Sequence, residues 1–324
     1  MSLLLSLGLA LPLAACAPLP TVVPTEAPTE APAPTDTAAP APTEDSTITV
    51  VDSLGREVTL TAPPQKIVSL APSNTEILFA LGAGDRLIGR DEFSDYPAEA
   101  LDVPSIGSLY PSVNTEAVVA LEPDLVLAAG ITNPDDVQKL ADLGLTVFTT
   151  RIAGTIDDIY ADITDVGTLI GKDEAAAALV AQMQARVAAV EAATANVTER
   201  PTVFYELDAT DPSSPYTTGP GTFNDQLINL AGGENVGNLS TEMYFQISLE
   251  QLVAADPQII VLGSSLYGGQ TPELVAARDG WANISAVKTG KVYTFNDNLI
   301  SRPGPRIVDG LEELAKLIHP ELFQ

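Results

Sequence analysis

Two stretches of the sequence repeat one local pattern, and this repeat restricts how the chain can fold. TEAVVALEPDLVL at residues 115–127 and LEQLVAADPQIIVL at residues 249–262 each predict a short helix, a proline stop and a buried strand. A shift of 134 positions superposes the two prolines and carries Glu116 onto Glu250. NTEILFALGAG and NDQLINLAGGE form a second such pair, in which an asparagine and a glycine recur. The repeats predict two lobes of similar structure.

Strand-like and helix-like segments alternate on both sides of one long helical segment. Residues 47–170 open with a hairpin-like stretch and continue as an α/β series, and residues 199–324 form a second series. Between them, residues 173–195 contain no Gly or Pro and are rich in strong helix formers. This predicts an α/β fold of two lobes with parallel-rich central sheets, joined by a bridging helix within residues 171–198.

The glycine-rich stretch GAGDRLIG does not match a nucleotide-binding loop. A dinucleotide fingerprint needs a third glycine where this chain has Leu87, and it must open a helix, whereas this stretch follows one. In that preceding helix, Ser73 and Glu76 match a capping box, and Gly82 is typical of a helix end. The glycines are therefore interpreted as a helix end and a turn.

The N-terminal stretch MSLLLSLGLALPLAAC predicts a lipoprotein signal peptide at residues 1–15. Its apolar run ends in small residues before Cys16, which would carry the lipid; the alternative is an ordinary core cysteine. Residues 16–46 are almost entirely Pro, Ala, Thr and acidic residues, which favour an extended, disordered linker. A lipid anchor and a stalk predict a protein held at the outer face of a cell membrane.

Charge and residue types exclude several functions. The net charge of −28 argues against nucleic acid and against an anionic membrane surface, so any membrane attachment is through the lipid anchor. A single cysteine rules out a Cys-rich metal site, and no Walker motif, zinc signature or nucleophile elbow is present. The one histidine, His319, is interpreted as a structural group near a helix end. We therefore expect no catalytic residues, no metal site, no cofactor and no enzymatic activity.

Glu116 and Glu250 fall two positions after the candidate helix caps Asn114 and Ser248. Acidic residues in a first turn complement the helix dipole, which is a purely local explanation. Equivalent positions in two lobes also fit a pair of surface charges that meet basic sockets on a symmetric partner. Local chemistry alone leaves both interpretations open.

Six stretches make the chain resemble the substrate-binding proteins of ABC importers for vitamin B12, haem and iron siderophores. They are KIVSLAPSNTEILFALGAGDRLIGR, DEFSDYPAEALDVPSIGSL, NTEAVVALEPDLVL, LINLAGGENV, SLEQLVAADPQIIVL and RPGPRIVDGLEELAKLIHPE. The resemblance covers the chain from about residue 47 to its end. It implies two Rossmann-like lobes on one rigid helix, a ligand cleft between the lobes, and a monomer that delivers its ligand to a permease dimer with its ATPase. It also implies that Glu116 and Glu250 dock to permease arginines.

The resemblance further suggests ligand-binding residues. EFSDYPAEA is similar to the B12-binding branch, in which an aromatic residue at this place contacts the corrin. Flat aromatic faces suit a large planar ligand, and an arginine suits a phosphate, propionate or carboxylate. The expected ligand-binding residues are Phe93, Tyr110, Tyr216, Tyr244, Asn298 and Arg302, each aromatic having core packing as its alternative.

The identity of the ligand stays open between three classes. Tyr and Phe stand where the B12 branch has tryptophans, and the only tryptophan, Trp281, is interpreted as structural. A corrinoid is slightly favoured. The alternatives are haem, with Tyr96, Tyr216 or Tyr244 as its iron ligand, and ferric siderophores. An anchored α/β enzyme would need ligating cysteines that the mature domain lacks, and an adhesion module would lack a closed cleft with convergent aromatics.

Overall fold

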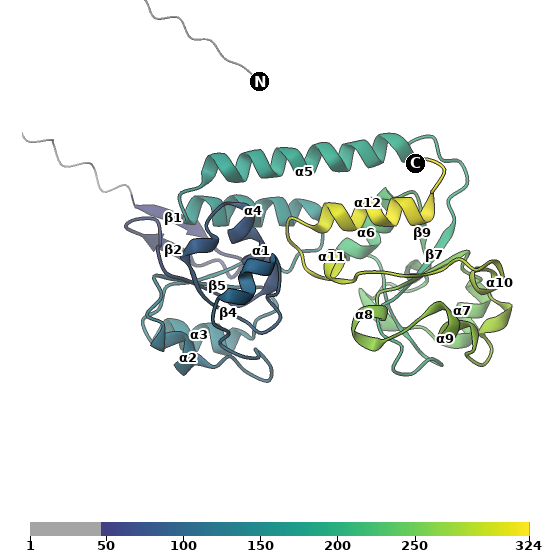
Figure 1. The fold of residues 1–324 in the computed structure, drawn as a ribbon, viewed down its shortest axis with the longest axis horizontal. Helices are drawn as coiled ribbons and strands as arrows, with labels where there is room; N and C mark the ends of the chain where they lie inside the picture. The colour runs from purple at the N-terminus through teal and green to yellow at the C-terminus, as the bar shows by residue number, and fades with distance from the viewer. Residues whose placement is uncertain (1–46, 324) are drawn as a thin grey trace, which may run out of the picture. The chain divides into compact units, whose positions relative to one another are not determined.

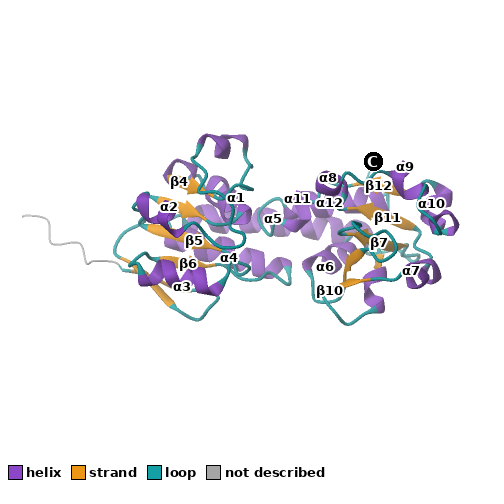
Figure 2. Ribbon diagram, turned by 90° about the horizontal axis from the view of Figure 1, so that it is seen from below, coloured by secondary structure: helices purple, strands orange, loops and turns teal. Residues whose placement is uncertain are grey.

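The computed structural model describes residues 47–323, which fall in one compact unit. The predicted signal peptide, the predicted linker and Cys16 lie outside the described residues. None of the helices between residues 47 and 323 combines the length and the hydropathy that a membrane span requires. Figure 1 labels the helices and several of the strands, and Figure 2 shows helices beside the strands in both halves of the chain.

The first half contains a hairpin and a four-stranded parallel sheet. The hairpin pairs β1 (Ile48–Val51) with β2 (Glu57–Leu60). The sheet has the order β4 (Leu87–Arg90), β3 (Ile67–Ser69), β5 (Leu125–Ala128) and β6 (Val147–Thr149). Its helices are α1 (Pro72–Ala80), α2 (Thr115–Ala120), α3 (Pro134–Asp142) and α4 (Ile156–Leu169).

The second half contains another four-stranded parallel sheet. Its order is β12 (Val292–Thr294), β11 (Ile259–Leu262), β7 (Thr202–Glu206) and β9 (Glu234–Asn235). A separate antiparallel pair joins β8 (Tyr216–Thr218) to β10 (Tyr244–Gln246). The helices are α6 (Phe223–Leu230), α7 (Leu249–Ala255), α8 (Ser265–Gly268), α9 (Pro272–Ala276), α10 (Ser285–Thr289), α11 (Asn298–Ser301) and α12 (Ile307–Ile318).

The two sheets share one topology, as the sequence repeat predicts. In both, the first strand lies between the second and third strands, and the fourth strand lies beyond the third. Among the described non-glycine residues only Glu122 and Asp256 have positive φ, at 49° and 45°, and each precedes the proline of its repeat. Gly82 and Gly232 end their helices with φ of 68° and 82°, in the left-handed region that glycine enters at little cost. The repeated helix ends are therefore confirmed.

The long helix α5 spans Asp173–Thr194, 22 residues, and packs against helices of both halves. It contacts α4 from the first half and α6 and α12 from the second, and one apolar core cluster includes residues of all four helices. Helix α4 is not distinguished in the sequence analysis, although Thr155 and Asp158 form a capping box at its start. Gly167 lets α4 approach α5 closely, because a Cβ there would lie 2.4 Å from the Cβ of Ala176.

The predicted capping box at Ser73 and Glu76 is wrong. Helix α1 begins after Ala71, which makes no side-chain cap bond, with Pro72 in its first turn. The carboxylate of Glu76 is buried and accepts two hydrogen bonds from Arg306 instead. A charged partner forms stronger hydrogen bonds than a backbone amide, which explains why this carboxylate turns away from the helix start.

Trp281 and His319 occupy structural positions, as the sequence predicts. The Trp281 side chain is fully buried, and its ring lies edge-on to Phe204 with the ring centroids 6.3 Å apart. His319 follows the last turn of α12, where Nε2 lies 3.1 Å from the carbonyl oxygen of Gly232 and Nδ1 lies 3.0 Å from Glu321.

Candidate functional site

A cavity of about 280 Å³ lies between the two halves of the chain. Its walls in the first half are residues 71–74, 129–131 and 150–153, which follow the carboxyl ends of β3, β5 and β6. Phe223, Tyr244 and residues 301–303 close it from the second half. Ligands of open α/β sheets bind outside the carboxyl ends of parallel strands, so the cleft cavity is where we expect a ligand.

Tyr244 and Arg302 are the two predicted ligand-binding residues that line the cleft cavity. Tyr244 is half-exposed, and partial burial raises the pKa of its hydroxyl. Tyr216 is opposite Gln246 in the β8–β10 register, which makes it a diagonal neighbour of Tyr244. Diagonal neighbours share one face of a sheet at about 7–8 Å, so the two tyrosines form an aromatic surface beside the cavity.

The other predicted residues do not line the cleft cavity. Phe93 is 56% exposed on the loop after β4, and Tyr110 is 87% exposed on the chain leading to α2. Their exposure excludes the alternative of core packing for both rings. Asn298, at the start of α11, accepts a hydrogen bond of 2.9 Å from the hydroxyl of Tyr267, a residue that the sequence analysis did not identify.

Arg302 is buried and already holds partners from both halves. Its Nη1 lies 2.5 Å from Oδ1 of Asp95, and its Nη2 donates to the hydroxyl of Tyr267 at 3.3 Å. Glu76 lies 3.8 Å away. Burial acts to raise the pKa of Asp95, but the hydrogen bond and charge of Arg302 outweigh it, and this pKa is lowered. The predicted anion-binding residue Arg302 is therefore already paired with a carboxylate of the protein, that of Asp95.

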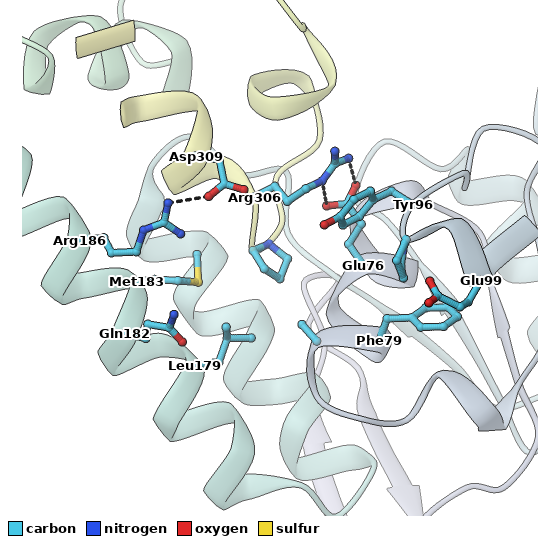
Figure 3. A pocket seen from close by; sticks show the side chains of 13 residues that line it. Glu76, Phe79, Tyr96, Glu99, Leu179, Gln182, Met183, Arg186, Arg306 and Asp309 are labelled. Atoms are coloured by element: carbon cyan, nitrogen blue, oxygen red, sulfur yellow. Dashed lines mark hydrogen bonds and ion pairs between the residues drawn. The ribbon is translucent and has the colours of Figure 1, made fainter. Parts of the chain in front are cut away.

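A second ion pair joins α1 to the start of α12 (Figure 3). Glu76 accepts from Nη2 and Nε of Arg306 at 2.6 and 2.9 Å, and the guanidinium lies 3.8 Å from the centroid of the Tyr96 ring. Burial raises the pKa of Glu76 although Arg306 and Arg302 oppose the shift. The pair borders a cavity of about 510 Å³ against α5, in which Leu179 and Met183 form part of the wall. Arg306 thus covers the ring of Tyr96, one of the three candidate haem ligands.

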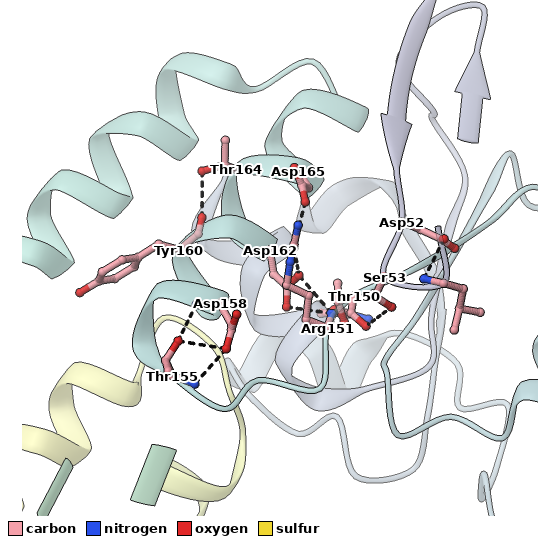
Figure 4. Close-up of polar contacts among 12 residues, drawn as sticks. Asp52, Ser53, Thr150, Arg151, Thr155, Asp158, Tyr160, Asp162, Thr164 and Asp165 are labelled. Carbon is pink, nitrogen blue, oxygen red and sulfur yellow. Dashed lines mark hydrogen bonds and ion pairs between the residues drawn. The ribbon is translucent and has the colours of Figure 1, made fainter. Parts of the chain in front are cut away.

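Arg151 and Asp162 are a third charged pair; both line the cleft cavity, and Figure 4 shows their contacts. Nη1 of Arg151 lies 2.7 Å from Asp162 and 2.8 Å from Asp165, and its backbone N–H also donates to Asp162. Burial raises the pKa of Asp162 to about 6, although the hydrogen bonds and charge of Arg151 act in the opposite direction. Desolvation therefore dominates at this carboxyl group.

We predict that Asp162 makes the folding stability depend on pH between about 4 and 6. Its folded pKa lies above the ordinary value, so the folded state binds the proton more tightly than the unfolded state. The contribution of Asp162 to the free energy of unfolding is fully present below about pH 4 and is lost as pH rises through about 6, with a slope on the order of 1 kcal/mol per pH unit. Urea unfolding of the wild type and of Asp162→Asn at pH 4.5 to 7.5, in steps of about 0.5 unit, measures this contribution. Parallel plots of the free energy of unfolding against pH for the two proteins would contradict this role of Asp162.

Glu116 and Glu250 occupy equivalent, exposed positions in the two halves. Each lies in a first helical turn, behind caps that the sequence predicts: Asn114 accepts from the backbone of Ala117, and Ser248 accepts from that of Gln251. Neither carboxylate is needed as the cap. Within residues 47–323, no group of three or more His, Cys, Asp or Glu side chains is placed to hold a metal ion.

Comparison with known proteins agrees with this architecture. An ABC transporter substrate-binding lipoprotein of Bacillus subtilis, YvrC, is 36% identical over 282 residues, which are 86% of this chain and 87% of that one. A cobalamin-binding protein of Halobacterium salinarum is 36% identical over 278 residues, 84% of this chain and 74% of that one. The sequence profile described as periplasmic binding protein matches residues 67–299.

Two solved structures give the same result at the level of the fold. The vitamin B12-binding protein of Vibrio cholerae superposes with a TM-score of 0.68 at 28% identity, covering 81% of this chain and 99% of that one. A periplasmic haem-binding protein from Roseiflexus sp. RS-1 superposes with a TM-score of 0.72 at 26% identity, covering 80% and 99%. With the profile match extending over most of the described residues, the chain belongs to the periplasmic binding protein family.

Proposed function

We propose that this protein is the extracytoplasmic solute receptor of an ABC importer and that it captures a metal chelate, with a corrinoid placed first. The observation that carries the proposal is the cleft cavity between two repeated α/β halves, with an aromatic ring and an arginine in its wall. The family consists of solute-binding transport proteins rather than enzymes, and relatives at 36% and 30% identity are named cobalamin-binding and vitamin B12-binding proteins.

Aromatic burial and one cationic group supply the binding in this proposal. Tyr244 and Tyr216 offer adjacent rings beside the cleft cavity, and Phe93 and Tyr110 offer exposed rings on loops of the first half. Apolar faces give most of the affinity of such a site, and a few polar groups fix the orientation of the ligand. Arg302 would meet an anionic group of the ligand in place of the carboxylate of Asp95, and Asn298 holds Tyr267 beside it.

Haem and ferric siderophores are the alternative ligands. Haem would need a tyrosine ligand here, and of the three candidates Tyr244 lies in the cleft wall, whereas the ring of Tyr96 is covered by Arg306. A siderophore needs no ligand from the protein, and its carboxylate would pair with Arg302. Solved haem-binding proteins share the fold at TM-scores similar to that of the B12-binding protein, so the fold does not separate these ligands.

The proposal assigns the remaining features to transport. Cys16 carries the lipid, residues 16–46 are the tether, and residues 47–170 and 199–324 are the lobes joined by the helix segment 171–198. Glu116 and Glu250 contact the permease dimer, whose ATPase supplies the energy. The protein acts as a monomer and provides no catalytic group and no cofactor of its own.

Visible absorbance of the purified protein tests the ligand class. The protein is incubated separately with cyanocobalamin, haemin and a ferric siderophore, passed through a desalting column, and scanned. We expect the corrin spectrum to remain with the protein at one equivalent and to be lost in Tyr244→Ala, because this substitution removes an aromatic face from the cleft wall. Retention of haem alone or siderophore alone replaces the corrinoid with that ligand. Retention of none contradicts the proposed function.

A further inference from the structure

The start of helix α1 forms part of the wall of the cleft cavity, through residues 71–74. Pro72 has no N–H to offer, and Ala71 at the cap position makes no side-chain cap bond. The backbone N–H groups of Ser73 and Asn74 find no acceptor among the described residues. Free N–H groups at a helix start favour an anion, because the helix dipole places partial positive charge there.

The hydroxyl of Ser73 is a further free donor at this helix start. Ser73 is only 6% exposed, and its hydroxyl makes no hydrogen bond with any described residue. It differs from the hydroxyls of Tyr160 and Thr218, which also lack partners in the described part of the chain but have almost no accessible surface. The Ser73 hydroxyl retains accessible surface, and the space that Ser73 lines is the cleft cavity. Buried polar groups almost always have a partner, so we expect this hydroxyl to find one in a molecule bound there.

The charged side chains in the wall of the cleft cavity favour the same sign of ligand. They are Arg151, Asp162 and Arg302, so the lining has an excess of positive charge. The chain as a whole carries −28 and repels anions, which means that local donors must hold an anionic group. Arg302 is already paired with Asp95, whereas the donors of Ser73 are free. An anion can therefore reach the start of α1 without displacing a carboxylate of the protein.

We propose that the start of α1 binds an anionic oxygen group of the metal chelate, a phosphate diester or a carboxylate, through the hydroxyl and N–H of Ser73 and the N–H of Asn74. This inference rests on the proposed function and adds the part of the ligand that the first half recognises. Hydrogen bonds from hydroxyl and backbone N–H groups to a charged oxygen are short and strong. Arg302, which lies 3.8 Å from Glu76 on the same helix, would meet the same group from the second half after releasing Asp95.

Calorimetric titration of the purified chain with cyanocobalamin and with dicyanocobinamide tests this site. Both compounds contain the corrin ring, and only cyanocobalamin contains the phosphate diester. Ser73→Ala removes a hydroxyl that makes no hydrogen bond within the described residues, so the fold should not change. We expect the affinity of Ser73→Ala for cyanocobalamin to fall about tenfold, the value of one hydrogen bond to a charged group. Its affinity for dicyanocobinamide should equal that of the wild type, which also shows that the variant is folded.

Other pairs of compounds apply if the absorbance experiment retains a different chelate. For haem the pair is haemin, which has two propionate groups, and haemin dimethyl ester, in which both are neutral. For a siderophore it is ferric aerobactin, which has free carboxylates, and ferrichrome, which is neutral. In each pair, Ser73→Ala should lose affinity for the anionic compound and keep its affinity for the neutral one. The pair that shows this difference identifies the anionic group as a phosphate diester or a carboxylate.

Ser112→Ala is the matched control, because it removes an exposed serine hydroxyl outside the cleft cavity; it should bind both compounds like the wild type. Equal affinity of the wild type and Ser73→Ala for the anionic compound overturns this inference and leaves the proposed function standing. An equal loss for both compounds of a pair does the same, because it assigns the effect of Ser73 to the shape of the cavity. Binding of no chelate by the wild type contradicts the proposed function, and this inference with it.

Discussion

The substitution Glu206→Gln is expected to lower the free energy of unfolding by about 3–5 kcal/mol, because it leaves a buried arginine without its counter-charge. Glu206 ends β7 with its side chain fully buried, and Arg278 holds it through two hydrogen bonds of 2.5 and 3.0 Å. Ser264 donates a third, of 2.7 Å. The guanidinium of Arg278 also lies 4.4 Å from the centroid of the Trp281 ring, so a displaced arginine disturbs the core of the second half.

The double variant Glu206→Leu with Arg278→Met tests whether an unpaired charge causes the loss. Replacing both partners with apolar residues removes the buried charges together, so most of the lost stability should return. Glu312→Gln is the control for an exposed pair, since Glu312 and Arg186 are both about one-third exposed, and it should cost less than about 1 kcal/mol. Urea denaturation measures all variants. A loss below about 1 kcal/mol for Glu206→Gln would refute the argument.

The same ion pair supports the candidate site. Arg278 and its partner Gln270 hold residues 264–280 against the end of β7. Within this segment, Tyr267 contacts Asn298 and Arg302. The position of the predicted anion-binding arginine therefore depends on a buried charge pair that lies outside the cleft cavity.

Local signals in the sequence were enough to predict the architecture. The caps at Asn114 and Ser248 and the glycines at 82 and 232 act within a few residues, so they can be recognised without knowing what packs nearby. The 134-residue repeat then predicts that both halves have the same sheet. Local signals did not predict helix α4, because its β-branched residues and Gly167 lower its intrinsic helix propensity. Packing against α5 compensates for this low propensity.

The site was predicted less completely because its contacts join residues far apart in the chain. Asp95 and Arg302 are separated by 207 positions, and Glu76 and Arg306 by 230. Glu76 matches a capping box locally, and only the arrangement of the two halves shows that an arginine competes for it. Resemblance to a family indicated Arg302, but no local pattern indicates that Asp95 and Tyr267 hold it.

Reversing both proposed docking charges, Glu116→Lys with Glu250→Lys, is expected to abolish uptake of the metal chelate and leave its affinity for the protein unchanged. Both carboxylates are exposed and equivalent in the two halves, and neither lines the cleft cavity. Under the proposed function they face permease arginines, so each reversal replaces an attraction with a like-charge repulsion, which costs several kcal/mol at an interface. Uptake of labelled chelate into proteoliposomes with the purified transporter measures the effect, and a binding assay on the same variant measures affinity.

The effect of net charge on uptake must be separated from the effect of position. The chain has a net charge of −28, so any charge reversal weakens its general repulsion of anionic surfaces. Glu57→Lys with Glu313→Lys makes the same change in net charge at two exposed positions outside α2 and α7, and should preserve uptake. Each single reversal should reduce uptake partially, since one half still docks. Normal uptake by Glu116→Lys with Glu250→Lys would show that these glutamates serve only the dipoles of their own helices. Equal loss in the control pair would assign the effect to charge alone.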